Sequence, residues 1–421
     1  MYKIYFKQAI EMLKQNKFFS IISILGTALA IMMIMAIIVT DEIKNISVAP
    51  ENNRDRTLYL TYQTLKDSTN GGVSISTGWI EYDVIKNYIP LLKTPKLISA
   101  KTTSNALLST EVSDNTISGK IVCTDPVYWK LFSFSFIEGR AFSEEAFQSG
   151  LREAVISESM ARKIFRGEKA LGQTLKINFR LYMVIGIIKD VSPVFTNASS
   201  DIWVPYTSLK EPENRQYSVI LLAKNKNDFE AIREEIKRIE RKYDEDEITK
   251  TLTLRWPESH RIRSMGIRGN NENEIKENAE IRNRKIWFIL IIIMLVPAVN
   301  LSGLNLSRIK RRTQEIGVRK AFGAKKHIIL IQILWENLIT SFIGGIFGLL
   351  FSVIIIFLMK DWLLGISQES AIPLNTIISI PIFFSVFAAC LIINILSATI
   401  PAYRASRMTI VHSLTNNDKL S

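Results

Sequence analysis

Four long apolar runs divide the chain, and each is long enough to cross a bilayer as a helix. About 20 helical residues, at ~1.5 Å each, span ~30 Å of hydrocarbon. The first run, residues 18–40, contains no charged residue. We predict four transmembrane helices from this pattern. The other three occupy residues 285–307, 328–359 and 370–403.

Three details refine this prediction. Pro297 predicts a kink in the second helix. The last two runs exceed one bilayer thickness, so those helices are expected to tilt or protrude. An alternative for the first run is a cleaved signal peptide, because Ala28 and Ala30 resemble a processing site. The apolar run continues through Val39, which is too long for a signal sequence, so we expect an uncleaved anchor.

The basic residues predict which side of the membrane each segment faces, because short cytoplasmic loops carry an excess of Lys and Arg. Segment 308–326 is rich in both, with Glu315 as its one acid. The amphipathic N-terminal segment 1–17 and the tail 404–421 are also basic. We therefore expect both termini and segment 308–326 to be cytoplasmic. The regions expected outside are residues 41–284 and the loop 360–369.

The long segment between the first and second runs has the composition of a globular domain, and strand and helix patterns alternate in it. Strands are predicted at residues 57–62, 105–110, 153–156, 174–178, 182–188, 217–223 and 249–254. Helices are predicted at residues 79–89, from a Ser157 cap to Phe165, and along Phe229, Ile232, Ile236, Ile239 and Tyr243. The fold class is thus membrane α-helical plus an extracytoplasmic α+β domain of two lobes, inserted between helices 1 and 2. A mobile linker is expected at residues 269–274.

Composition and charge fit a protein that meets lipid. Hydrophobic residues make up 47% of the chain and the mean hydropathy is +0.14, both high for a soluble protein. The net charge of +13 resembles that of nucleic-acid-binding proteins, but many basic residues flank apolar runs, so we expect membrane lipids and no nucleic acid as partners. Cys123 and Cys390 predict no disulfide, and the scattered histidines predict no metal site.

Segment 308–326 has no continuous apolar face for a core, so we interpret it as an amphipathic helix at the membrane surface. One alternative is an inert basic loop. The segment is longer than a connector needs to be, and Gly317 and Gly323 leave room for a close partner or a tight turn. From the residues alone, partner docking and an inert loop are equally supported.

Several motifs resemble the MacB/FtsX-like permeases of ABC transporters, from the first apolar run to Arg407. Residues 311–324 read RRTQEIGVRKAFGA, similar to the family signature E-I-G-[IV]-R-[KQ]-A-x-G-A. Residues 400–407 read IPAYRASR and resemble the motif that closes the last helix. Residues 138–142, 155–161 and 170–174 are similar to runs of the MacB-like periplasmic core.

The resemblance implies that segment 308–326 is a coupling helix that docks on a cytoplasmic ATPase. The residues to which this role is carried are Glu315, Ile316, Gly317, Arg319, Lys320 and Gly323. It also implies the bacterial cytoplasmic (inner) membrane and a second permease protomer, in a homodimer or a heterodimer. A periplasmic adaptor is a further expected partner.

The sequence lacks the phosphate-binding loop that ATP hydrolysis needs, GxxxxGK[ST]. The Gly119-Lys120 pair is followed by Ile121, and Asp114 stands where the first glycine belongs. We therefore predict that the chain is not an enzyme and binds no cofactor. ATP and Mg are expected on a separate ABC-type ATPase subunit.

Two further features lie in the third apolar run. Glu336 is a candidate functional acid within the membrane, and an equally supported alternative is a snorkelling or interhelical contact near one interface. Gly344, Gly345 and Gly348 form a face of small residues that suits close helix packing. We favour packing within one protomer over a dimer seam.

The leading functional hypothesis is mechanotransmission. ATP hydrolysis in the partner moves the coupling helix, and the spans carry that movement to the outer lobes, which act on an exported substrate. The alternative is an FtsX-like regulator that activates a cell-envelope protein without transporting anything. A membrane-tethered enzyme or sensor is disfavoured, because the sequence shows no catalytic constellation.

Overall fold

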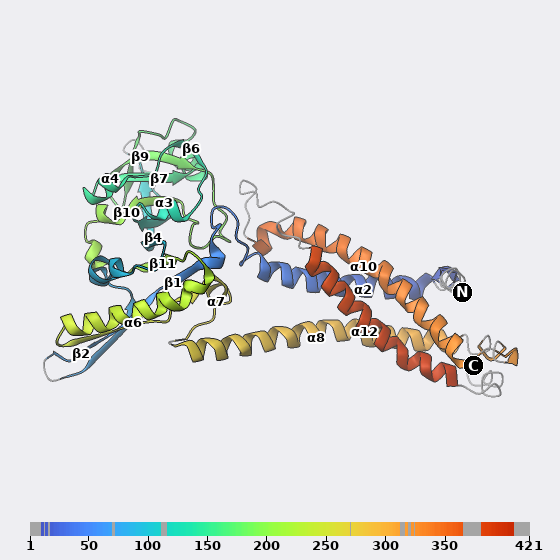
Figure 1. Cartoon of the computed structure of the whole chain (residues 1–421). Coiled ribbons are helices and arrows are strands. Elements are labelled where there is room, and N and C mark those ends of the chain that lie inside the picture. Colours follow the sequence, from blue (N-terminus) through green and yellow to red (C-terminus); the bar gives the residue numbers. More distant parts are fainter. Residues whose placement is uncertain are drawn as a thin grey trace. The chain divides into compact units, whose positions relative to one another are not determined.

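A computed structural model of the chain describes residues 10–11, 13–15, 17–69, 72–110, 116–269, 271–311, 316–318, 321–323, 325–364 and 380–407. The chain folds as two units, whose elements Figure 1 labels. One unit is helical, and the other, Ile43–Ile281, combines a large sheet with short helices.

The helical unit is built from long helices. They are α2 (Lys17–Glu42), α8 (Glu272–Arg311, from Arg282 onward), α10 (Lys326–Leu364) and α12 (Ile380–Arg407). In the described part of the chain, three segments are long and apolar enough to cross a membrane: Lys17–Glu42, Lys326–Met359 and Pro381–Thr399. The predicted span 285–307 lies within α8, and a count of four spans stays a prediction. The first ten residues of the predicted fourth span, 370–379, lie outside the described residues.

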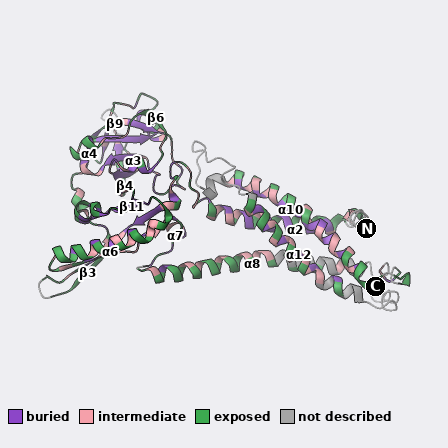
Figure 2. Ribbon diagram, in the orientation of Figure 1, coloured by how far each residue is buried: buried purple, intermediate pink, exposed green. Residues whose placement is uncertain are grey.

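Helix α2 exposes a row of large apolar side chains, which is unusual for the surface of a soluble protein. They recur at every fourth position and include Ile21, Leu25 and Leu29; exposed and buried positions alternate along the helix (Figure 2). The buried face carries small and polar residues such as Ser23 and Thr27 in its first half and larger ones such as Ile31 further along. A helix needs this distribution when its outer face meets lipid and its inner face packs closely on other helices.

The predicted linker at 269–274 is wrong over its last residues, because α8 begins at Glu272. Asn271 caps the helix: the Glu274 amide donates to Asn271 Oδ1 at 2.9 Å, and Asn271 Nδ2 donates to Glu274 Oε1 at 3.3 Å. A Lys276–Glu272 ion pair of 2.6 Å supports the first turn. Polar composition suggested a loop, but this spacing of side chains is that of a helix start.

One lobe of the sheet-containing unit is a split β-α-β arrangement. Strand β1 (Thr57–Leu60) is antiparallel to β11 (Ser218–Leu222), which is antiparallel to β4 (Leu97–Ser109). β1 and β4 are therefore parallel with β11 between them, and β13 (Glu258–Ser259) pairs on the far side of β1. The order β13-β1-β11-β4 is that of a ferredoxin-like sheet.

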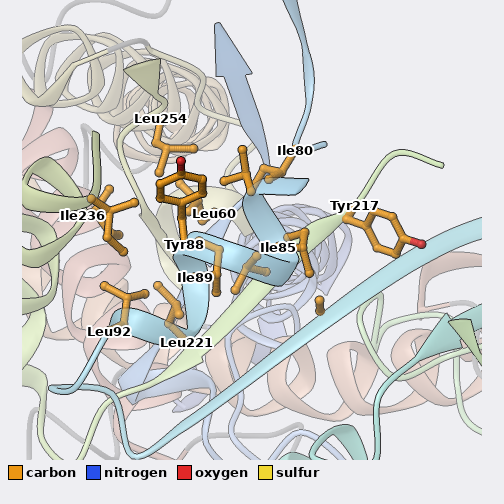
Figure 3. Packing of buried hydrophobic residues seen from close by; sticks show 14 of the residues in the cluster. Leu60, Ile80, Ile85, Tyr88, Ile89, Leu92, Tyr217, Leu221, Ile236 and Leu254 are labelled. Carbon is orange, nitrogen blue, oxygen red and sulfur yellow. The ribbon is translucent and has the colours of Figure 1, made fainter. Parts of the chain in front are cut away.

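Helix α6 (Phe229–Asp246) and the short helices η3 (Val84–Tyr88) and η4 (Ile89–Leu91) pack on this sheet (Figure 3). The apolar spacing predicted for α6 is confirmed, since four of its five apolar positions are buried. The buried side chains that form this core include Leu60, Ile85, Tyr88, Tyr217, Leu221, Ile236 and Leu254.

The predicted helix 79–89 is wrong at its start. Trp79 ends strand β3 (Ser74–Trp79), which pairs with β2 (Tyr62–Asp67) and, through β2, with β12 (Lys250–Leu254). The next residue, Ile80, bridges to Tyr217 in the main sheet. These backbone bonds hold the chain extended, so the helical turns begin only beyond them.

The second lobe is a small closed barrel. Pairing runs β4, β5 (Ile117–Thr124), β10 (Ile202–Pro205), β7 (Glu153–Ser157), β9 (Arg180–Ile188) and β8 (Thr174–Ile177), and β8 pairs back to β4. Closure removes open strand edges. Strand β6 (Phe136–Gly139) pairs with β9. The unit also contains the short helices α3 (Tyr128–Leu131) and α4 (Glu144–Gln148), and α7 (His260–Ser264), which lies against β1 and β13 of the first lobe.

Helix α5 (Glu158–Phe165) packs its buried side chains into the barrel core, and the predicted Ser157 cap is confirmed. The Met160 amide donates to Ser157 Oγ at 3.3 Å. Each lobe has its own apolar core, and a third buried cluster, which includes Tyr59, Val122 and Trp203, joins strands of both lobes. The lobes also share β4, because Leu97–Lys101 pairs with β11 and Lys101–Leu108 pairs with β5. A single sheet therefore connects both lobes.

Candidate functional site

The structure describes part of the predicted coupling segment 308–326, and Ile316 in this part packs against two helices. Ile316 is half-buried and packs against Ile329 and Ile333 of α10 and Ala402 of α12. Gly317 is buried beside it. The segment is therefore in contact with both the start of α10 and the end of α12. The predicted docking residues Glu315, Arg319 and Lys320 lie outside the described residues.

The same segment presents an apolar pair to its surroundings. Val318 is 46% exposed and Phe322 is 89% exposed, one turn apart, and the Phe322 amide donates to the Val318 carbonyl at 3.1 Å. Gly323 follows with φ +88°, a left-handed conformation that ends a helical turn. Val318 and Phe322 were not among the docking residues predicted from the sequence, although their i, i+4 spacing is that of one helix face.

The predicted small-residue face lies against α2 of the same chain. A Cβ added at Gly344 would lie 2.8 Å from Thr27 Cβ, and one at Gly348 would lie 2.8 Å from Ile31 Cβ. Both distances are shorter than carbon atoms tolerate, so only glycine permits this approach. Gly345 faces α12, where its missing Cβ leaves room for the Phe387 ring.

Buried polar side chains lie one to two turns before these glycines. Glu336 is 7% exposed, and its carbonyl accepts a hydrogen bond from Thr340 Oγ1 at 2.8 Å. Asn394 Nδ2 of α12 donates to Ser341 Oγ at 3.0 Å. In an apolar medium such a bond between helices is costly to break, because the freed groups find no water. These contacts help to join α10 to α12.

The ends of α2 and the membrane part of α8 are linked by an ion pair. Arg282 Nη2 lies 3.2 Å from Asp41 Oδ1. In the predicted topology Arg282 lies on the outer side, where the positive-inside rule disfavours a basic residue. Its pairing with Asp41 offsets that charge.

A buried Arg54 holds the first residues that follow α2, Ile43–Ile46, to the sheet-containing unit. Its Nη1 donates to the carbonyls of Ile43, Lys44 and Ile46 at 3.4, 3.1 and 3.0 Å. Its Nη2 donates to the Val194 carbonyl at 2.8 Å, and its Nε donates to Glu51 Oε2 at 2.7 Å. Glu51 Oε1 accepts from the Asn197 and Ala198 amides at 2.9 and 3.0 Å. We call this set, Arg54 with Glu51 and their partners, the Arg54 clamp.

Helix α7, which precedes α8 in the chain, also forms hydrogen bonds with the segment Ile43–Ile46. His260 Nε2 lies 2.7 Å from the Lys44 carbonyl and its Nδ1 lies 3.1 Å from the Tyr59 hydroxyl. Ser264 Oγ donates to Asn45 Oδ1 at 2.6 Å. The segment Ile43–Ile46, where the chain enters the sheet-containing unit, is therefore hydrogen-bonded to α7, near where the chain leaves that unit.

Lys101 is a second buried cation near the clamp. It is 5% exposed, and its Nζ donates to the Asn197 carbonyl at 2.8 Å. Burial lowers the pKa of Lys101 to about 7, with a smaller contribution from Arg263, while Glu51 opposes the shift. Near neutral pH this side chain therefore loses its proton much more readily than an exposed lysine.

This lowered pKa predicts how stability depends on pH. Between pH 7 and the ordinary pKa of 10.5 the unfolded chain binds a proton at Lys101 that the folded chain has released, so stability rises with pH. Lys101→Met is expected to remove a slope of up to ~1.4 kcal/mol per pH unit. Urea unfolding followed by the fluorescence of buried Trp203 measures the slope. The exposed Lys86→Met serves as control, and equal slopes in all three proteins would contradict the prediction.

These features define a class: a membrane-embedded helical unit carries a large α+β unit, and a short segment fixed to two helices presents an apolar pair. Comparison with known proteins identifies the family. A family model for a "MacB-like periplasmic core domain" matches residues 20–239, and one for an "FtsX-like permease C-terminal" matches residues 287–410. The first covers more than half of the chain. The chain belongs to the MacB/FtsX-like family of ABC transporter permeases.

Curated relatives are distant in sequence. The uncharacterized ABC transporter permease YknZ of Bacillus subtilis is 23% identical over 312 residues, which cover 72% of this chain and 70% of that protein. The macrolide export ATP-binding/permease protein MacB of Photorhabdus laumondii is 24% identical over 71% of this chain and 43% of its own length. The pyoverdine export protein PvdT of Pseudomonas entomophila is 28% identical over 68% of this chain and 41% of its length. The chain thus spans less than half the length of these two exporters.

Solved structures of similar domains also match. The extracellular domain of YknZ is 16% identical, covers 46% of this chain and 99% of that structure, and superposes with a TM-score of 0.35. The periplasmic region of MacB from Actinobacillus actinomycetemcomitans is 16% identical and superposes with a TM-score of 0.33 over 46% of this chain and 88% of that structure.

Proposed function

We propose that this chain is a permease subunit that couples ATP hydrolysis in a separate cytoplasmic ATPase to movements of its outer domain. One observation carries the proposal: Val318 and Phe322 are exposed on a segment whose neighbour Ile316 packs on both α10 and α12. A partner that binds this apolar pair would pull on two helices at once. The family supports the proposal, because an ABC permease works with an ATPase.

The path from that segment to the outer domain runs through packed contacts. Gly344 and Gly348 join α10 to α2, and the Arg54 clamp holds the chain that leaves α2. Close packing and buried hydrogen bonds transmit displacement better than a flexible link does, because neither deforms without cost. We propose that this path opens and closes the outer lobes.

The cargo is proposed from the relatives. Proteins named for macrolide export and pyoverdine export match most of this chain, which supports export or extraction of a substrate from the outer face.

We further propose the inner membrane as location, cytoplasmic termini, four spans and a dimer of permease protomers, with ATP and Mg bound only by the ATPase. A periplasmic adaptor is an additional proposed partner. An FtsX-like regulator remains the alternative if no cargo moves.

Phe322→Asp is the direct test of the docking pair. Burial of an aromatic residue at the centre of an interface is worth ~2 kcal/mol or more, so loss of at least ~30-fold in ATPase co-purification is expected from the tagged full chain in mild detergent. Mass spectrometry identifies the co-purified subunit, and an ATPase assay quantifies it.

The control makes the same change at a matched position. Phe179, at the turn between β8 and β9, is 86% exposed, nearly as exposed as Phe322, but it belongs to the other unit. Phe179→Asp is expected to leave co-purification unchanged. If the ATPase co-purifies equally well with Phe322→Asp and Phe179→Asp, the assignment of Phe322 to ATPase docking is wrong. If the natural chain recovers no ATPase at all, the coupling function falls and the regulator hypothesis takes its place.

A further inference from the structure

The barrel lobe contains a cavity of about 190 Å³ that the proposed mechanism does not use. Strands β4 and β5 form one wall, where Thr102 pairs with Cys123 and Ser104 pairs with Ile121. The β8–β9 hairpin forms another wall, and the connection between β10 and β11 closes the third side. The mouths of small barrels are common ligand sites.

Three cations from separate parts of the chain line this cavity. They are Arg180 at the start of β9, Lys210 after the short helix η5 (Tyr206–Ser208), and Arg215 before β11. Arg180 and Arg215 form no ion pair with any residue in the described part of the chain, and Lys210 has only an exposed contact of 3.9 Å with Glu211. Since like charges gathered without counterions repel one another, this arrangement favours an anion.

The residues that line the cavity besides the three cations are uncharged, and they are of two kinds: apolar ones such as Ile121 and Ile177, and polar ones such as Thr102, Ser104 and Asn178. Ile121, Cys123 and Ile177 are each 2–3% exposed and belong to the barrel core. Burial raises the pKa of Cys123 to about 12, and burial also raises the pKa of Tyr182, whose hydroxyl donates to the Ser208 carbonyl at 3.3 Å. Both groups are therefore neutral at physiological pH, and among the described residues no acidic side chain lines the cavity.

We infer that this cavity binds a small amphipathic organic anion, with its carboxylate or phosphate group held by Arg180 and Arg215 and its apolar part against Ile121 and Ile177. Arginine suits either anion, because its planar guanidinium donates two parallel hydrogen bonds. The volume lies below the ~300–1,000 Å³ of sites for drug-sized ligands, so the ligand is compact. Binding here is a property of the chain alone and does not depend on the proposed ATPase.

The test uses the full chain in phosphatidylcholine nanodiscs and four small probes. Benzoate and phenyl phosphate carry an anion on an apolar ring, benzamide is the neutral analogue, and inorganic phosphate lacks the ring. Titration calorimetry is expected to detect the two aromatic anions only, and the tighter of them identifies the anion class. In Arg180→Gln/Arg215→Gln we expect binding at least tenfold weaker, because two charge-assisted hydrogen bonds are lost.

A matched control removes two charges elsewhere. Lys86 and Arg241 are exposed and lie in the other lobe, so Lys86→Gln/Arg241→Gln is expected to bind as the natural chain does. A second variant, Ser104→Phe, fills the cavity mouth without changing charge and is also expected to abolish binding. Unchanged melting temperatures show that the variants fold.

Three results would overturn the inference. One is equal affinity of benzoate and phenyl phosphate for the natural chain and Arg180→Gln/Arg215→Gln. Another is binding of benzamide with similar affinity, which would show that charge plays no part. The third is binding of inorganic phosphate as tight as that of the aromatic anions, which would show that the apolar interior contributes nothing.

Discussion

Arg54→Ala is expected to lower the free energy of unfolding of the sheet-containing unit by about 3–5 kcal/mol. Arg54 and Glu51 are both about 1% exposed at their side chains and form a buried pair of 2.7 Å. Removing the guanidinium leaves the Glu51 carboxylate buried without its partner and takes the Arg54 donor from four backbone carbonyls, of which that of Lys44 still faces His260 Nε2. The cost of those unsatisfied groups exceeds the modest net value of the bonds themselves.

The measurement is urea unfolding of the full chain in detergent, followed by tryptophan fluorescence, to which Trp203, fully buried in the sheet-containing unit, contributes. Arg56→Ala is the matched control, because Arg56 lies two residues away and bonds mainly to Asn53 near the surface. Its loss is expected to cost ~1 kcal/mol or less. Equal effects of the two substitutions would show that the buried clamp has no special role.

A double variant separates the buried charge from the lost contacts. Glu51→Gln/Arg54→Met removes both charges and keeps similar volumes, so it is expected to be less damaging than Arg54→Ala. The clamp also predicts a functional effect, since it holds Ile43–Ile46 to the outer unit. If the movement of α2 drives the outer lobes, Arg54→Ala reduces transport more than it reduces ATPase binding. Loss of both together would point to general unfolding instead.

The helices and strands that were predicted correctly are specified by residues close to one another in the sequence. The helix α6 repeats apolar positions at helical spacing, and Ser157 lies immediately before α5 as its cap. Strands β7, β8, β9, β11 and β12 are bounded by residues close to those predicted. The helix α6 and the strands β8 and β12 bury one face, while β7 and β11 are buried along their whole length. Both patterns are visible in the local order of residue types, as periodic apolar positions or as a short apolar run.

The elements that the sequence did not predict depend on distant partners. Strand β3 is exposed along almost its whole length, so it has no apolar face to recognise, and it forms because β2 offers backbone hydrogen bonds. The barrel closes through Leu108 and Ile177, which are far apart in sequence. No local pattern specifies such a pairing, because it follows from the tertiary fold.

The candidate functional residues likewise include some that the sequence pointed to and some that it did not. The sequence singled out Ile316 and Gly317 for a docking role, which stays a prediction; the structure shows Ile316 packed against α10 and α12, and Gly317 buried. The sequence did not separate the exposed Val318 and Phe322 from their buried neighbour, because that depends on where α10 and α12 lie. Arg54 was missed for a different reason: a charged residue is normally at the surface, and only its tertiary partners justify burial.

Gly344→Leu/Gly348→Leu is expected to separate α10 from α2 and abolish transmission. Each added side chain would overlap α2, since even a Cβ at Gly348 would lie 3.0 Å from the Ala28 carbonyl oxygen. Overpacking costs ~1–3 kcal/mol per site, and the two sites lie one turn apart on one face, so their effects act on the same contact. In lipid no hydrophobic force restores helix contact once close packing is lost.

Gly26→Leu provides the matched control. Gly26 lies in α2 as well, but nothing lies within 4 Å of the Cβ that a side chain would add there. The same leucine is therefore expected to be tolerated. Thermal unfolding of the helical signal in detergent measures the stability of the bundle, and transport in reconstituted vesicles measures the function.

The same pair of variants decides between the two roles considered for the glycine face. If the face packs on α2 within one protomer, the double variant lowers the melting temperature of the bundle, and native mass spectrometry still detects the same oligomer among the folded molecules. If it forms a dimer seam, the double variant yields stable, folded monomers with an unchanged melting temperature. The approach of Gly344 and Gly348 to Thr27 and Ile31 favours the first outcome, because α2 already occupies that face.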